Sequence, residues 1–262
     1  MNRIDKLFKE KSGNILSVYF TAGYPAYDDT TPTIAALAAH GVDMIEIGVP
    51  FSDPMADGPV IQNSGTVALR NGMTLKKLFG QLETIRTGAT GAAGIDIPLV
   101  MMGYLNPIMQ YGVEEFCRDC ARVGVDGVII PDLPLADYIE KYKPIIDRYG
   151  LHCIMLITPE TSEERIRLID TTTTGFIYMV STASTTGARE SFDERTLDYF
   201  RRVDAMRLRN PRMIGFGISN KTTFDAACRF ASGGIIGSAF IRLTGQSASP
   251  DEAVTKLIER IG

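Results

Sequence analysis

The sequence is poor in the residues that many enzymes use for catalysis. Among its 262 residues it has two histidines and no tryptophan. His40 lies at the end of a predicted helix and His152 begins a predicted strand, so neither favours a Ser-His-Asp or Cys-His arrangement. No lysine lies within a predicted strand, which argues against a Schiff-base aldolase. No Asp/His cluster has the spacing of metal ligands. Nucleophilic and metal-dependent chemistry are therefore disfavoured.

Long apolar runs and clusters of one charge are also lacking. No stretch is apolar for long enough to span a bilayer, and the opening MNRIDKLFKEKSGN lacks the apolar core of a secretory signal. A cytoplasmic location is therefore expected. The chain has 27 Lys+Arg and 31 Asp+Glu, a net charge of -4, without the basic clusters that nucleic acids or anionic membranes require.

The four cysteines include one C-x-x-C pair, Cys117 and Cys120. Such a pair can indicate a metal or redox site. Here it lies in a segment with helical periodicity, and no second pair completes a zinc-binding set. We therefore expect buried or half-buried free thiols that pack as small apolar groups.

Eight short, nearly continuous apolar runs predict parallel strands buried on both faces. They are Ile15–Thr21, Met44–Gly48, Pro98–Gly103, Gly127–Pro131, His152–Ile157, Phe176–Val180, Met213–Gly217 and Gly234–Ser238. Helical patterns lie between and after them, at Asp28–His40, Leu75–Arg86, Val113–Val123, Ala136–Tyr149, Glu163–Asp170, Glu194–Leu208, Thr222–Ala231 and Pro250–Ile261.

Eight βα units in order predict an α/β fold, a (β/α)8 TIM barrel that forms a single domain over residues 1–262. An extra N-terminal helix, Asn2–Lys11, is expected to cover the bottom of the barrel. A doubly wound sheet is the alternative. Its G-x-G-x-x-G turn is missing after the first predicted strand, where the sequence reads FTAGYP.

Glu46 is a carboxylate inside an apolar strand, between Ile45 and Ile47. Because strand side chains alternate, the two isoleucines face the outer helices and Glu46 points into the mouth of the barrel. Burial is expected to raise the pKa of Glu46, which suits a general acid near neutral pH. A structural Glu in an internal ion pair is the alternative.

Asp57 follows shortly after Glu46, in the loop SDPMADGP on the catalytic face. Two carboxylates in different surroundings can divide acid and base roles. A turn residue or helix cap is the alternative interpretation of Asp57. Asp53 competes for the second role, although its Asp-Pro context is more typical of a turn.

Glycines and small polar residues end the last three predicted strands. Glycine lets backbone N–H groups approach an anion, and the loops after strands seven and eight are the usual phosphate site of such barrels. The segments are Thr185-Thr186-Gly187, Gly215–Ser219 and Gly237-Ser238. A flat apolar group could bind beside the phosphate, against Phe20, Tyr104, Ile129, Tyr178 and Phe216, although each of these could equally be core.

The segment EIGVPFSDPMADGPVIQ, Glu46–Gln62, resembles the signature of tryptophan synthase α subunits. The resemblance covers essentially the whole chain. Its supporting segments are FTAGYP at Phe20–Pro25, MGYLNP at Met102–Pro107, PDLP at Pro131–Pro134, GFGIS at Gly215–Ser219 and GSA at Gly237–Ala239.

This resemblance implies retro-aldol cleavage of indole-3-glycerol phosphate to indole and glyceraldehyde 3-phosphate, in tryptophan biosynthesis and without a cofactor. Glu46 would be the main acid/base group, and Asp57 would bind the indole N–H. By the same resemblance, Phe20 and Tyr178 would lie near the indole. The predicted indole contacts are completed by Tyr104, Ile129, Thr186 and Phe216. The phosphate would contact Gly187, Gly217, Gly237 and Ser238.

The resemblance also implies a partner. The family works with a β subunit that carries pyridoxal phosphate, in an αββα tetramer, and indole passes to it through a tunnel. The loops Phe51–Gly58 and Tyr104–Gln110 would meet this partner. The implied interface residues are Asp53, Pro54, Asn106, Pro107 and Asp132.

One segment departs from the family pattern. Many members read S-R-x-G-V-T-G after the sixth strand, whereas residues 181–187 here read STASTTG. Thr182 and Ser184 thus replace an arginine and a glycine in the loop expected to close over substrate. A catalytically weak module that mainly activates the β subunit is therefore the alternative function. Indole-3-glycerol phosphate synthase and ribulose-phosphate epimerase barrels are disfavoured, because a strand lysine and metal-binding His and Asp are not seen.

Overall fold

A computed structural model describes residues 1–88, 94–181 and 191–262 and confirms the predicted (β/α)8 barrel. Eight parallel strands pair in chain order, and β8 closes the barrel against β1. The strands are β1 (Ile15–Thr21), β2 (Met44–Gly48), β3 (Leu99–Met102), β4 (Gly127–Ile129), β5 (His152–Ile157), β6 (Ile177–Val180), β7 (Arg212–Gly215) and β8 (Gly233–Ile236).

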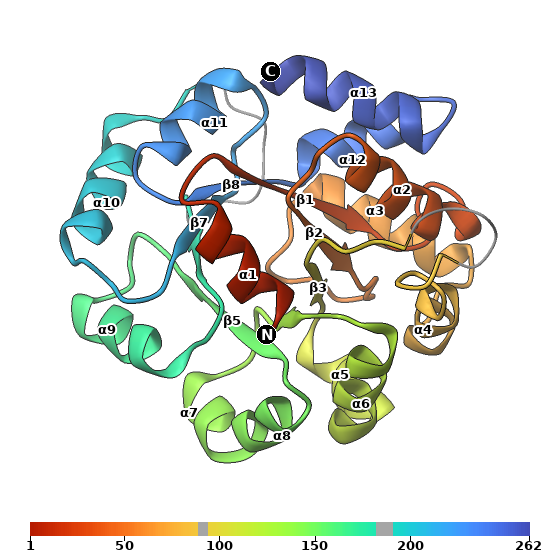
Figure 1. The fold of residues 1–262 in the computed structure, drawn as a ribbon, viewed down its shortest axis with the longest axis horizontal. Coiled ribbons are helices and arrows are strands. Elements are labelled where there is room, and N and C mark those ends of the chain that lie inside the picture. Colours follow the sequence, from red (N-terminus) through yellow and green to blue (C-terminus); the bar gives the residue numbers. More distant parts are fainter. Residues whose placement is uncertain (89–93, 182–190) are drawn as a thin grey trace.

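Helices surround the strands, as the end-on view in Figure 1 shows. The longer ones are α1 (Arg3–Glu10), α2 (Thr30–Ala39), α3 (Pro59–Arg70), α4 (Leu75–Leu82), α6 (Val113–Val123), α9 (Glu163–Thr172), α10 (Glu194–Ala205), α11 (Lys221–Cys228) and α13 (Pro250–Ile261). Shorter ones are η1 (Tyr27–Asp29), α5 (Leu105–Tyr111), α7 (Leu135–Asp137), η2 (Tyr138–Tyr142), α8 (Lys143–Arg148) and α12 (Ser238–Thr244). No helix among the described residues is long and apolar enough to cross a membrane.

The sequence pattern does not predict α3 and α5. The buried residues of α3 are Ser64, Gly65 and Ala68, which are too small or polar to mark an apolar face. In α5 the single buried residue is Ile108. Both helices lie in the loops on the catalytic face, after β2 and β3.

Strands β7 and β8 end two residues earlier than predicted, at Gly215 and Ile236. Phe216 and Gly217 have φ values of +66° and +77°, which a strand cannot accommodate. The segment after β8 is the helix α12, which begins at Ser238. These early strand ends leave the glycines in the loops above the barrel.

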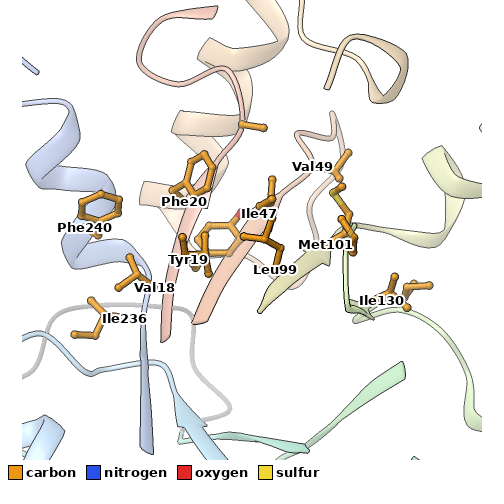
Figure 2. Close-up of a cluster of buried hydrophobic side chains, with 14 of the residues drawn as sticks. Val18, Tyr19, Phe20, Ile47, Val49, Leu99, Met101, Ile130, Ile236 and Phe240 are labelled. Carbon is orange, nitrogen blue, oxygen red and sulfur yellow. The ribbon is translucent and has the colours of Figure 1, made fainter. Parts of the chain in front are cut away.

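The strands divide their side chains between two apolar cores. Along β1, Val18 and Phe20 pack in the outer core between strands and helices, together with Phe240 of α12 (Figure 2). Ile15 belongs to the interior core, with residues from every strand around it. The interior core consists of Ile4, Ile15, Met44, Val100, Ile129, Ile154, Phe176, Tyr178, Val180, Met213 and Ile235.

The N-terminal helix α1 lies across the end of the barrel that faces the viewer in Figure 1, as predicted. Ile4 is fully buried and joins the interior core. The Asn2 side chain caps the helix by accepting from the Ile4 N–H at 2.9 Å, and its Nδ2 donates to the Asp126 carbonyl at 2.8 Å. The barrel is therefore closed at its amino-terminal end.

Two of the predicted free thiols, Cys117 and Cys120, are confirmed as buried in α6. Burial raises the pKa of Cys117 to about 12, so this thiol is protonated and unreactive at neutral pH. Within the described parts of the chain, no group of His, Cys, Asp or Glu side chains has the arrangement of a metal site.

Asp126 is a buried carboxylate that joins three elements at the closed end. It accepts from Arg86 Nη2 at 2.8 Å, from Arg3 Nη1 at 3.1 Å and from the Leu99 N–H at 2.9 Å. Arg86 also donates to the carbonyls of Gly124, Ile95 and Ile97, so its charge is well solvated by the protein. This network fixes α1 and the start of β3 against β4.

We predict that Asp126→Ala lowers the free energy of unfolding by about 3 kcal/mol, because it leaves the half-buried Arg86 without its partner charge. Urea denaturation measures the change. Asp96→Ala is the matched control, because Asp96 also pairs with Arg3, at 3.1 Å, but is 77% exposed. An equally small effect of both substitutions would contradict the structural role of Asp126.

Candidate active site

Glu46 lies near the carboxyl end of β2 and is fully buried. The Ser17 hydroxyl donates to Glu46 Oε1 at 3.0 Å. Glu46 Oε2 has no hydrogen-bond partner among the residues that the structure describes. Burial raises the pKa of Glu46 to about 8, although the Ser17 hydrogen bond opposes this shift. Glu46 therefore carries its proton at neutral pH, and it forms no ion pair with any residue that the structure describes.

Asp57 lies in the loop between β2 and α3 and is 8% exposed. The Asp57 N–H donates to the Pro54 carbonyl at 3.1 Å, and Gln62 Nε2 donates to the Asp57 carbonyl at 2.7 Å. The Tyr104 hydroxyl accepts from the Ala56 N–H at 3.0 Å and hydrogen-bonds the Asp57 carboxylate. These contacts hold the loop in place and aim the carboxylate.

Burial raises the pKa of Asp57 to about 6, and the Tyr104 hydrogen bond limits the shift. At neutral pH Asp57 is thus mostly ionised while Glu46 is mostly protonated, since the pKa of Glu46 is about 8. Two carboxyl groups whose surroundings separate their pKa values can act as an acid and a base in one site.

A narrow hollow opens at the carboxyl ends of the strands, with Asp57 in its wall. Its wall consists of Tyr19, Asp57, Ile61, Met102, Tyr178, Phe216, Gly217, Ile218, Ile235, Gly237, Ser238 and Ala239. The wall is mostly apolar, with a few polar groups at one side.

Tyr19 supplies a large part of the wall and is paired in register with Glu46 of β2. Its ring extends from β1 toward β2 (Figure 2), and its hydroxyl lies directly against Gly48. Any side chain at position 48 would overlap this ring. The glycine that follows Glu46 and Ile47 is therefore required for Tyr19 to reach the hollow.

Tyr178 repeats this arrangement on the other side of the barrel. Its hydroxyl lies against Gly215 of the neighbouring strand β7, where a Cβ atom would overlap it. Phe216 packs edge-on against the Tyr178 ring, with ring centroids 6.2 Å apart. Together the two rings form an apolar wall that suits a flat aromatic ligand.

The polar side of the hollow is formed by the loops after β7 and β8. Gly217 adopts a φ of +77°, which glycine accommodates without strain. The Ser238 hydroxyl is buried and has no hydrogen-bond partner within residues 1–88, 94–181 and 191–262. A buried hydroxyl without a partner is unfavourable, so this side of the hollow is prepared for a polar ligand group.

The structure brings together half of the predicted ligand residues. Tyr178, Phe216, Gly217, Gly237 and Ser238 all line the hollow. Thr186 and Gly187, and with them the segment Thr182–Gly187, lie outside the described residues.

Three predicted indole contacts do not line the hollow. Phe20 is in the outer core because it alternates with Tyr19, and Ile129 is fully buried in the interior core. Tyr104 instead hydrogen-bonds the Asp57 carboxylate through its hydroxyl. Tyr19 is missed by the sequence interpretation, although the alternation that places Glu46 inward also places Tyr19 inward.

The predicted interface residues lie on neighbouring loops of the same face. Asp53, Asn106 and Asp132 are exposed, and Pro54 and Pro107 are half-buried. Asp132 Oδ1 accepts from the Leu105 N–H at 2.8 Å, which ties the loop after β4 to the start of α5. The exposed apolar residues Met55, 90% exposed, and Met109, 55% exposed, belong to this face.

The chain matches a known family along nearly its whole length. The profile described as tryptophan synthase alpha chain matches residues 6–261. The tryptophan synthase alpha chain of Parabacteroides distasonis is 61% identical over 261 residues, covering 100% of this chain and 99% of that protein. That of Bacteroides fragilis is 58% identical over 257 residues, covering 98% and 95%. The crystal structure of tryptophan synthase subunit alpha from Legionella pneumophila matches with a TM-score of 0.86 at 32% identity, covering 100% and 97%.

We predict that Gly48→Ala lowers the free energy of unfolding by about 1–3 kcal/mol, because the new methyl group overlaps the Tyr19 ring. In a Tyr19→Ala background the same substitution should have little effect, and a double-mutant cycle in urea measures this coupling. Gly80→Ala is the control, since nothing lies within 4 Å of its new methyl group. Additive effects of Gly48→Ala and Tyr19→Ala would show that the two residues do not interact.

Proposed function

Since this chain belongs to the tryptophan synthase alpha chain family, we propose that Glu46 and Asp57 are the acid/base pair of its reaction. The chain is a carbon-carbon lyase that cleaves indole-3-glycerol phosphate to indole and glyceraldehyde 3-phosphate in tryptophan biosynthesis. The observation that carries the proposal is the fully buried Glu46, protonated at neutral pH and in register with Tyr19, which lines the hollow.

Glu46 acts first as an acid. Its proton is transferred to C3 of the indole ring, which gives an indolenine whose ring nitrogen keeps its hydrogen and carries a positive charge. The bond between C3 and C1′ of the side chain then breaks, and its electron pair returns to the ring. The resulting Glu46 carboxylate accepts the proton of the C1′ hydroxyl as the aldehyde forms, so Glu46 ends the cycle protonated.

Asp57 stabilises the intermediate. Protonation at C3 places positive charge on the ring nitrogen, and an ionised Asp57 can accept a hydrogen bond from the indole N–H. The pKa of Asp57, about 6, keeps it ionised at neutral pH for this role. The Tyr104 hydroxyl, bonded to the same carboxylate, holds it in position.

The two sides of the hollow suit the two ends of the substrate. The rings of Tyr19, Tyr178 and Phe216 suit the indole, and Tyr19 takes the place of Phe20 in the set expected from the sequence. The buried Ser238 hydroxyl and the glycines Gly217 and Gly237 suit the phosphate. Thr186 and Gly187 remain proposed contacts by resemblance alone.

The family also defines the partner. Alpha chains assemble with a β subunit in an αββα complex, and pyridoxal phosphate belongs to the β subunit, so this chain itself uses no cofactor. We propose that the partner contacts Asp53, Pro54, Asn106, Pro107 and Asp132. The exposed Met55 and Met109 support this assignment, because large apolar side chains exposed on one face are typical of a protein interface.

We also propose a domain organisation and a cellular location for the chain. Residues 1–262 are proposed to act as one domain, since a single barrel uses strands from β1 to β8. A cytoplasmic location is proposed because the substrate is a phosphorylated intermediate of amino-acid biosynthesis.

We predict that Glu46→Gln lowers the rate of indole formation about 10³-fold or more, because the amide cannot transfer the proton. Asp57→Ala should also be severely impaired, though less so. Rates are measured on purified chain with and without the β subunit, and co-elution with that subunit checks that the surface is intact. Near-wild-type turnover by Glu46→Gln would overturn the assignment of Glu46 as the acid/base group. An unaffected rate in Asp57→Ala would favour the alternative interpretation of Asp57 as a turn residue.

The two pKa values predict a bell-shaped pH profile for kcat/KM of indole formation. Activity should fall below about pH 6, as Asp57 becomes protonated, and above about pH 8, as Glu46 loses its proton. Steady-state assays from about pH 5 to about pH 10 would test this, because that range extends beyond both limbs of the profile. A profile that rises steadily with pH would instead indicate that Glu46 has to start as a carboxylate.

A further inference from the structure

We infer that Ser17 is a positioning residue for the reaction: its hydroxyl holds Glu46 Oε1 and leaves Oε2 as the oxygen that exchanges protons with substrate. This inference rests on the proposed role of Glu46. Ser17 lies on β1, in register with Met44 of β2, two residues before the Tyr19–Glu46 pair. Ser17 and Glu46 are both fully buried.

The surroundings of Ser17 argue against a purely structural role. Its register partners in the flanking strands are Met44 and Ile235, and both belong to the apolar interior core. A hydroxyl in such a layer is unfavourable unless it is hydrogen-bonded, and an apolar residue would fill the space at lower cost. The Ser17 hydroxyl donates a hydrogen bond to Glu46 Oε1 at 3.0 Å, and this bond offsets the cost of burying the hydroxyl.

The same bond distinguishes the two oxygens of Glu46. Oε1 is held by Ser17, whereas Oε2 has no hydrogen-bond partner among the described residues. A carboxyl group fixed through one oxygen keeps the other in a defined direction, and proton transfer requires such alignment. Oε2 is therefore the oxygen that meets C3 of the indole and then the C1′ hydroxyl.

Ser17 also affects the acidity of Glu46. A hydroxyl that donates to a carboxylate stabilises the ionised form, and this bond lowers the pKa of Glu46 against the effect of burial. Without Ser17, Glu46 would hold its proton to higher pH. The carboxyl would then be a weaker acid and, with neither oxygen held, a less well-aligned one.

The test compares Ser17→Ala, Ser17→Thr and the wild-type chain. We expect Ser17→Ala to lower kcat about tenfold and to move the basic limb of kcat/KM upward by roughly one pH unit, which corresponds to the loss of one charge-assisted hydrogen bond. Ser17→Thr retains the hydroxyl and should restore both the rate and the limb. Thr33→Val is the control, because Thr33 is a buried residue of α2 whose hydroxyl has no partner in the described parts of the chain.

An infrared titration separates this inference from the proposed function. The carboxylic-acid band assigned by difference from Glu46→Gln should disappear at a higher pH in Ser17→Ala than in the wild type, whatever the catalytic role of Glu46. An unmoved band, or a Ser17→Thr variant as impaired as Ser17→Ala, would overturn the role of Ser17. A band that moves while the kinetic limb is absent from the wild type would instead overturn Glu46 as the reacting acid.

Discussion

The structure depends on the alternation of side chains along β2 inside a closed barrel. Ile45 and Ile47 fill the outer core against the helices, so Glu46 has to point inward. The barrel interior is apolar and closed at its amino-terminal end by α1, so an inward carboxyl group loses its water. The fold itself therefore raises the pKa of Glu46 and keeps it protonated at neutral pH.

The rest of the site follows from this placement. Tyr19 lies beside Glu46 in the barrel wall. Its ring fits there only because residue 48 is a glycine without a side chain. Glu46 is thus needed for its carboxyl group, and Gly48 for the space that it leaves to Tyr19. Asp57 comes from a loop and is less buried, and its pKa is raised less. A strand thus supplies the protonated group and a loop supplies the ionised one, and the difference in burial produces the difference in role.

Much of this could be predicted from the sequence, and the exceptions have physical causes. The eight strands and the direction of Glu46 follow from apolar runs and alternation, whereas Asp57 is identified mainly by the motif around it. Its place near the end of the first strand and the family resemblance predict Phe20 at the ligand, but the same alternation places Phe20 in the outer core and Tyr19 at the hollow. The helix α3 has small buried residues and therefore no apolar stripe to predict it.

The central claim is that burial in the barrel keeps Glu46 protonated at neutral pH. The most direct test is a pH titration of protein labelled with ¹³C at the glutamate side-chain carboxyl carbon, followed by NMR. The Glu46 signal is assigned by its loss in Glu46→Gln. The account predicts that this signal titrates with a midpoint of about 8. A midpoint near the ordinary glutamate value, about 4.3, would contradict it.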